Sequence, residues 1–217
     1  REEQEWPLAR TKYTSYYLHS GGKANTGSGD GTLSTALPKA EAPDNFSYDP
    51  ADPVPSTPDA PTDQRKLETR PDVLVFTSAA LKKPLEVTGP VEAVLYAASS
   101  APNTDFTAKL IDVYPDGRAI RLCDGIIRAS FREGSTGTSN IEPGKVYQYK
   151  IDLWATSNLF LQDHRIRVEV SSSNFPRFDR NLNTGGTFAF DSTLAVAKQT
   201  IYHSREYPSY IKLPVIE

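Results

Sequence analysis

Histidine, cysteine and serine side chains are the groups in this sequence that could carry acid–base or nucleophilic chemistry. His19, His164 and His203 lie on separate segments, and no two are spaced i, i+4, which excludes a zinc site on one helix. Asp163 precedes His164 and offers half of a catalytic triad, but the arginines that follow favour the start of a strand, where polar groups satisfy a turn. Cys123 lies in a strand-like run, where we interpret it as a small, half-buried residue rather than a catalytic thiol.

A serine nucleophile on a strand-to-helix turn requires the frame G-x-S-x-G, because the serine must stand on a sharp, strained bend. Ser28 and Ser135 have glycines nearby, but neither has glycine at both required offsets. The alternation of strands and helices that would host such a turn is also missing. We therefore predict no catalytic residue in this chain, and no cofactor or metal.

Residues 179–185 begin like a calcium-binding loop, with oxygen-bearing side chains at the first, third and fifth positions. The glycine comes one residue late, however, and Phe190 stands where an EF-hand has its bidentate acid. The preferred interpretation is a loop held by hydrogen bonds from Asn and Asp side chains to its own backbone. A cation site of another kind stays open as an alternative.

Strands are the elements that would position these groups. The sequence is rich in Pro, Tyr and short Val/Ile runs, and apolar and polar residues alternate clearly over 147–153 and 166–170. Such alternation indicates one buried and one wetted face, as in antiparallel sheets. Strands are expected at 13–19, 72–77, 91–99, 105–113, 119–124, 126–131, 147–153, 166–170, 195–203 and 210–215. Without a convincing long helix, this pattern predicts one all-β domain over 1–217, a jelly-roll β-sandwich.

Proline and glycine residues indicate turns and one long irregular segment. Gly89-Pro90 and Asp124-Gly125 are expected to be turns between strands. From 38 to 71 the chain is dominated by Pro, Asp and Ala, and neither helix nor strand is expected to survive so many prolines. A long structureless stretch is uncommon inside a compact domain. We therefore expect an extended strap that lies over the surface of another domain.

Charge and hydropathy exclude two classes of partner. The net charge of −3 leaves no basic stripe for nucleic acid, and no apolar run approaches the ~20 residues of a membrane helix. One cysteine rules out an internal disulfide. The chain starts at Arg1 and has no methionine, so we expect a piece of a longer protein, bacterial and cytoplasmic.

The most specific stretch is 170–186, Val-Ser-Ser-Ser-Asn-Phe-Pro-Arg-Phe-Asp-Arg-Asn-Leu-Asn-Thr-Gly-Gly. It resembles the C-terminal domain of the cocaine esterase and Xaa-Pro dipeptidyl-peptidase family of α/β-hydrolases. Segments that agree in order are 32–35, 48–55, 63–65, 104–110, 112–113, 115–120, 151–153, 156–158, 160, 164–165, 208–209 and 213–214. The resemblance covers nearly the whole chain, from 6 to 216, and favours the cocaine-esterase branch over the lactic-acid-bacterial peptidases.

This resemblance implies a galactose-binding-like jelly roll that is not itself catalytic. Members carry the Ser, Asp and His triad on an N-terminal α/β-hydrolase domain, which is absent from this chain, and no family catalytic residue falls on it. The C-terminal domain packs on that domain, helps shape the active-site cleft and contributes to homodimer contacts. Relatives usually have a glycine-containing loop that can reach toward the substrate pocket where this chain has only the short stretch from Ser56 to Thr62, so a pocket role there stays open.

The 170–186 stretch also has a physical interpretation of its own. Pro176 ends a strand by removing a donor, and the rings of Phe175 and Phe178 are expected to be buried beneath a loop held by residues 179–181. That loop either fixes the strand exit or presents a surface to the catalytic domain. Two rival functions are kept: a carbohydrate-binding module, which needs solvent-facing rings on a sheet face, and a self-contained hydrolase that uses Asp163-His164 and a nearby serine.

Overall fold

The computed structural model describes residues 2–58, 61–134, 138–186 and 190–217. These residues form eleven strands and two short 3-10 helices, and no helix among them is long and apolar enough to cross a membrane. The strands are β1 (Thr11–His19), β2 (Thr32–Ser34), β3 (Asp44–Tyr48), β4 (Leu74–Ser78), β5 (Leu85–Ser99), β6 (Asp105–Val113), β7 (Ala119–Arg128), β8 (Tyr147–Phe160), β9 (Arg165–Ser171), β10 (Ala197–Tyr202) and β11 (Tyr210–Ile216). The 3-10 helices are η1 (Leu67–Thr69) and η2 (Ala129–Phe131). The all-β prediction is confirmed.

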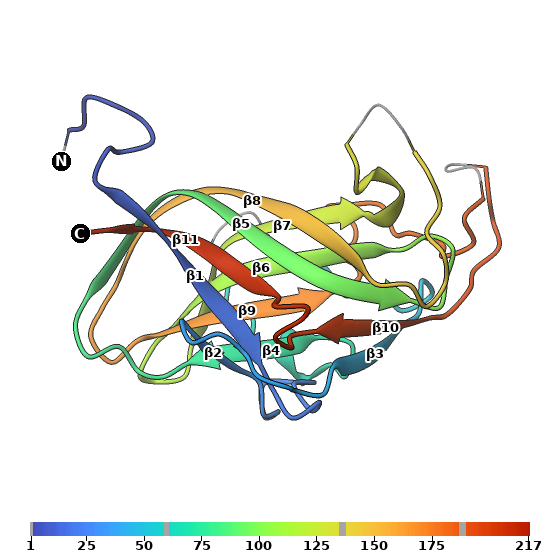
Figure 1. The fold of residues 1–217 in the computed structure, drawn as a ribbon, viewed down its shortest axis with the longest axis horizontal. Coiled ribbons are helices and arrows are strands. Elements are labelled where there is room, and N and C mark those ends of the chain that lie inside the picture. The colour runs from blue at the N-terminus through green and yellow to red at the C-terminus, as the bar shows by residue number, and fades with distance from the viewer. Residues whose placement is uncertain (1, 59–60, 135–137, 187–189) are drawn as a thin grey trace.

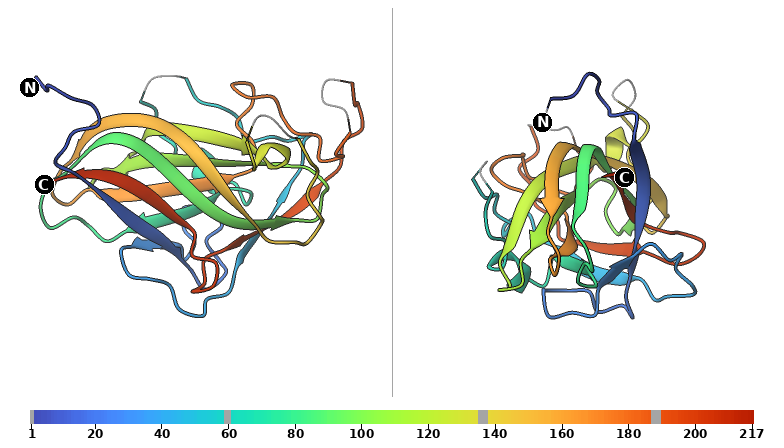
Figure 2. Two further views of the ribbon diagram at one scale, coloured as in Figure 1. Left: turned by 45° about the horizontal axis from the view of Figure 1, so that its top comes forward. Right: turned by 90° about the vertical axis from the view of Figure 1, so that its left-hand side faces the viewer.

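A hydrogen-bonded path links the strands in the order β3-β10-β5-β11-β1-β2-β4-β9-β6-β7, and β8 adds to β5 (Figure 1). The long strand β5 carries β8 along one edge and β10 and β11 along the other. Nearly all pairs are antiparallel, except that β2 meets β4 in parallel. The path therefore curls over on itself, and its strands enclose a central core, as the two views in Figure 2 show. This is the predicted sandwich.

The core is built from the alternating positions of facing strands. Tyr149, Ile151 and Leu153 of β8 are all fully buried, as their two-residue period predicts. The ring of Phe106 on β6 lies 4.8 Å from that of Tyr149, centroid to centroid. Burial of each such side chain contributes roughly 1.5–3 kcal/mol to the stability of the fold.

Both expected glycine turns are wrong, because β5 runs straight through Gly89-Pro90 and β7 through Asp124-Gly125. A Cβ on Gly125 would lie 2.0 Å from the carbonyl oxygen of Asp152 on β8. The glycine is therefore needed where β7 and β8 approach backbone to backbone, and not for a bend. The strand expected at 126–131 also ends early, since 129–131 form η2.

The proline-rich stretch contains a strand after all, because β3 (Asp44–Tyr48) pairs with β10. The rest, residues 49–58 and 61–71, is here called the strap, and it lies on the face of β4, β6, β7 and β9 that points away from the core. Asp63 bridges to Ile120 of β7, and the Nζ of Lys109 on β6 donates to Oε1 of Gln64 at 3.1 Å. Contact between the strap and another domain stays a prediction.

The strap changes the character of the face beneath it. The alternation at 166–170 predicts a wetted face, but Glu169 is only 2% exposed, so this expectation is wrong. Its Oε2 lies 3.2 Å from Nζ of Lys109, while Glu68 of the strap pairs with Arg167 at 2.6 Å. Burial raises the pKa of Glu169 to about 7, helped by the neighbouring Glu68 carboxyl and opposed by Lys109.

Candidate functional site

Residues 174–186, here called the signature loop, leave β9 and turn along the strap. The N–H of Phe175 donates to the carbonyl of Val54 at 3.0 Å, and the N–H of Ser56 donates back to the carbonyl of Phe175 at 2.6 Å. The N–H of Val54 also donates to Oγ of Ser173 at 2.8 Å. The start of the loop and residues 54–56 of the strap are therefore one hydrogen-bonded unit.

A buried carboxylate anchors the base of the loop. Asp124 of β7 is 4% exposed, and its Oδ2 accepts a hydrogen bond from Nδ2 of Asn174 at 2.7 Å. Its Oδ1 lies 3.1 Å from Nη1 of Arg121 and 3.2 Å from Nη1 of Arg177. Arg121 in turn donates to the carbonyl of Pro58 in the strap at 2.5 Å. Two cations and an amide compensate the buried charge, so strap, strand and loop share one anchor.

A second anchor holds the middle of the loop. Nδ2 of Asn181 donates to Oδ1 of Asp105 at 2.8 Å, and the hydroxyl of Tyr48 donates to the Asn181 carbonyl at 3.0 Å. Oδ1 of Asn181 accepts the N–H of Asn183 at 2.9 Å, which confirms the predicted side-chain-to-backbone bonding. Burial raises the pKa of Asp105 despite its bonds to Arg128 and Asn181. The loop is thus fixed from within, and it also presents an outer surface.

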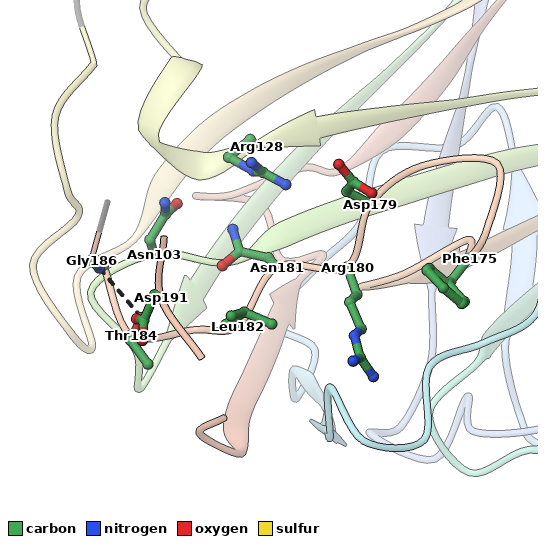
Figure 3. A pocket seen from close by; sticks show the side chains of 11 residues that line it. Asn103, Arg128, Phe175, Asp179, Arg180, Asn181, Leu182, Thr184, Gly186 and Asp191 are labelled. Carbon is green, nitrogen blue, oxygen red and sulfur yellow. Dashed lines mark hydrogen bonds between the residues drawn. The ribbon is translucent and has the colours of Figure 1, made fainter. Parts of the chain in front are cut away.

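Part of that surface is a hollow of about 300 Å³. Figure 3 shows Arg180 and Phe175 on one side of it, Asn181 and Leu182 near its centre, and Thr184, Gly186 and Asp191 on the other. The guanidinium of Arg180 lies 5.7 Å from the centre of the Phe175 ring. Phe175 is 37% exposed, so its expected burial is wrong. The backbone N–H and carbonyl of Phe175 are hydrogen-bonded to the strap, and the ring is left at the surface.

Further hollows of about 180, 220 and 510 Å³ adjoin the same loop. Large apolar side chains stand exposed around them or beside the loop, namely Phe131, Trp154, Phe175, Phe190, Leu194 and Val196. The loop adds Arg177 and Arg180 to this rim. Aromatic rings beside arginines are characteristic of protein–protein interfaces. The signature loop and these apolar residues are together called the loop surface.

His164, the histidine considered for catalysis, is held by a carboxylate and an aromatic ring of the fold. Nδ1 of His164 lies 2.8 Å from Oδ1 of Asp112, not Asp163, and the imidazole packs 4.4 Å from the ring of Tyr114. Among the hydrogen bonds of the described residues, none joins this ring to a serine. Cys123 is half-buried, and burial raises the pKa of its thiol to about 12, so it is protonated at neutral pH.

A cluster that sequence reasoning missed surrounds His203. Its Nε2 lies 2.9 Å from Oδ2 of Asp44 and 3.1 Å from Oγ of Ser20, while Nδ1 lies 3.3 Å from Oε2 of Glu41. The Ser20 hydroxyl donates to Asp44 at 2.7 Å, and His203 is fully buried. Burial alone lowers the pKa of His203, but Asp44 and Glu41 raise it overall. The cluster ties β1 and β3 to β10 in the interior, and no spacing in the sequence announces it.

In the described parts of the chain, no three His, Cys, Asp or Glu side chains gather as metal ligands. Asp179 and Asp191, at opposite ends of the loop region, line the 300 Å³ hollow. The bond from Thr184 Oγ1 is the largest of the effects that lower the pKa of Asp191. A cation site in this loop remains only the alternative interpretation, and the described residues offer no ligand set for it.

Comparison with known proteins agrees with this geometry. The chain is 50% identical over 228 aligned positions to the cocaine esterase of Rhodococcus sp. (strain MB1 Bresler), matching all of this chain and 40% of that protein. An aminopeptidase from the marine sediment archaeon Thaumarchaeota archaeon superposes with a TM-score of 0.89 at 32% identity, over 100% of this chain and 39% of that one. An α-amino acid ester hydrolase gives 0.84 and 31%, over 94% and 36%.

The chain therefore spans about 40% of the length of these relatives. Residues 1–212 match the family described as the X-Pro dipeptidyl-peptidase C-terminal non-catalytic domain. The match includes the signature loop, both of its anchors and the strap. The chain belongs to this family of non-catalytic C-terminal domains.

Proposed function

We propose that this domain docks through the loop surface onto a catalytic α/β-hydrolase domain of the same polypeptide. One observation carries the proposal: a loop fixed from within by buried Asp124 and Asp105 stands among exposed Phe and Trp side chains. Fixing a loop before binding lowers the entropy lost when it docks. The coverage of 40% of a cocaine esterase leaves room for such a domain elsewhere in the polypeptide.

The reaction would take place on that other domain, with hydrolysis of an ester or amide bond through an acyl-enzyme. This chain would contribute the wall of the cleft. Ser56 is hydrogen-bonded to Phe175, so the short stretch from Ser56 to Thr62 starts beside the proposed docking surface. We infer that the described part of this stretch, residues 56–58, 61 and 62, borders the cleft. The shortness of the stretch would leave more room for the acyl group than a longer loop leaves.

Hydrolysis assays of the 217-residue chain and of its full-length parent test this function. Activated esters and Xaa-Pro amides are offered to both under the same conditions. We expect turnover by the parent and none by the chain alone. Turnover by the chain that is lost on His164→Ala would instead support the self-contained hydrolase. The His164→Asn variant serves as a matched control for folding.

We also propose that the parent is a homodimer, and that β8 contributes to it. Among the described strands β8 pairs only with β5, and Leu159 and Leu161 at its far end are 51% and 48% exposed. Beyond its approach to β7 at Asp152, the far end of β8 is an edge that the described strands leave unpaired, with apolar neighbours, which is a ready template for a second copy. Light scattering of Leu159→Lys against the native parent tests this, with a monomeric variant as the expected result. A cytoplasmic location and a bacterial source stay predictions.

A further inference from the structure

Trp154 has the least ordinary backbone of the large side chains at the surface. It lies in the middle of β8, is 71% exposed, and has φ of 65°. Left-handed backbone is costly for a bulky residue and persists only where the surroundings enforce it. An exposed indole in such a conformation buries little apolar surface to offset that cost within the described chain. Strain of this kind concentrates at binding sites.

The fold holds Trp154 in place by two devices. The N–H of Trp154 donates to Oδ1 of Asp152 at 2.7 Å, which closes a local turn. The pairing of β5 with β8 shifts register here, between Pro90 and Glu92, so β8 carries a bulge. Bulges re-aim a side chain relative to the sheet. On the adjacent strand, Gly125 lets β7 approach Asp152 closely and leaves this bulge little freedom to relax.

The position of the indole connects it to the loop surface. Trp154 lines a hollow of about 220 Å³ together with Cys123, Asp124 and Arg177. Arg177 belongs to the signature loop, and Asp124 is the carboxylate that anchors that loop. The hollow is therefore continuous with the loop surface, and Trp154 marks its border on β8.

We propose that Trp154 is the anchor of the interdomain contact, and that its indole inserts into an apolar recess of the catalytic domain. This inference rests on the proposed function and names the residue that carries its affinity. Tryptophan and arginine are the residues most enriched at the energetic centres of interfaces. The chain spans about 40% of its relatives, so a large domain of the same polypeptide is available as the occupant.

A glycan is the rival occupant, and the neighbours of Trp154 argue against it. Sugar rings are held by several exposed aromatic rings along a sheet face or by a ring beside a metal-organised loop. The other exposed positions near Trp154 on β8 are Lys150, Asp152, Ala155 and Ser157, and none of them is aromatic. In the described residues the hollow contains no other aromatic side chain. A single indole beside a guanidinium suits a protein recess better.

The experiment uses the full-length parent with Trp154→Phe, Trp154→Ala and, as a matched control, Leu37→Ala. Leu37 is likewise exposed, at 65%, but it lies outside the 220 Å³ hollow and outside both proposed contact surfaces. The emission of native protein minus that of Trp154→Phe isolates the signal of this indole, and acrylamide quenching measures its accessibility. Hydrogen–deuterium exchange of residues 174–186 reports docking of the loop surface.

We expect a blue-shifted difference spectrum that acrylamide quenches poorly. Trp154→Ala should raise the exchange rates of 174–186 about 30-fold, the factor that corresponds to a hot spot of about 2 kcal/mol. Leu37→Ala should leave them unchanged. A protected loop beside a freely quenched Trp154 overturns this inference and leaves the proposed function standing. A loop that exchanges as freely as open surface overturns both. Saturable quenching of Trp154 by a cello-oligosaccharide assigns the indole to a glycan and overturns the anchor role.

Discussion

The strap-covered face and the loop surface lie next to each other, but they differ in which side chains they bury and which they expose. Under the strap, Lys109 and Glu169 are almost fully buried, and the cover is supplied by the same chain. On the loop surface the buried carboxylates lie below, while Phe175 and Trp154 stand in solvent. The domain thus covers one polar face by itself. It leaves the other as an apolar surface, which is what a partner requires.

The two regions share one residue. Asp124 binds Asn174 and Arg177 of the signature loop, and through Arg121 it reaches the strap carbonyl of Pro58. The rigidity of the loop surface therefore depends on the strap, and a substitution at Asp124 tests that dependence.

Asp124→Ala is expected to have the largest effect, because it removes the buried carboxylate that binds Arg121, Arg177 and Asn174 and so releases both regions. Breaking a buried ion pair from one side costs about 3–5 kcal/mol. Urea unfolding of native and variant protein measures the loss in the free energy of unfolding. Asp116→Ala, which removes an exposed partner of Arg118, is the control and should change little. A loss for Asp124→Ala as small as that of the control would show that this anchor is dispensable.

Glu169→Gln separates the two regions by their response to pH. The native state holds a proton on Glu169 up to a pKa of about 7, whereas the ordinary value in the unfolded chain is 4.5. The free energy of unfolding should therefore fall as the pH rises from 4.5 to about 7. In Glu169→Gln this part of the fall is removed. His203, whose raised pKa makes its contribution disappear as the pH rises above its ordinary value of 6.5, is present in both proteins and cancels.

Unfolding at about pH 5 and about pH 8, for native and variant protein, gives the four values needed. Equal losses of stability in the two proteins would mean that the strap-covered carboxyl does not hold its proton.

Phe190→Ser should have the smallest effect on the domain itself. The side chain is 88% exposed, and surface substitutions of this kind stay within about 0.5 kcal/mol. The solubility of the domain should rise, because an apolar side chain of the loop surface is removed. A loss of more than about 2 kcal/mol in urea unfolding would show that Phe190 is packed within the domain and does not belong to an open surface.

Local patterns predicted the strands well where periodicity was uninterrupted. The range 105–113 is β6 itself, and 147–153 is the start of β8 with the expected inward face. The predictions that are wrong concern contacts between distant segments. Gly125 was expected to form a turn, but it permits the close approach of β7 to Asp152. Glu169 was expected to face solvent, but the strap covers it.

The site was predicted in a similar, partial way. The 170–186 run marked the right loop, and its Asx bonding followed from composition. Phe175 was expected inside because it is a ring, yet its exposure depends on Val54 and Ser56, about 120 residues earlier. The sequence did not indicate a role for Trp154, since a tryptophan predicts neither a positive φ nor a bulge.

The fold class, the family and the lack of a G-x-S-x-G motif could be predicted from local patterns, because periodicity and short motifs are local properties of the chain. Which faces of the sheets are covered depends on the tertiary structure. Burial of Lys109 and Glu169, the anchor at Asp124 and the presentation of Trp154 each require segments that lie far apart in sequence. Whether a side chain meets water or a partner is set by what packs over it, and that is not a local property.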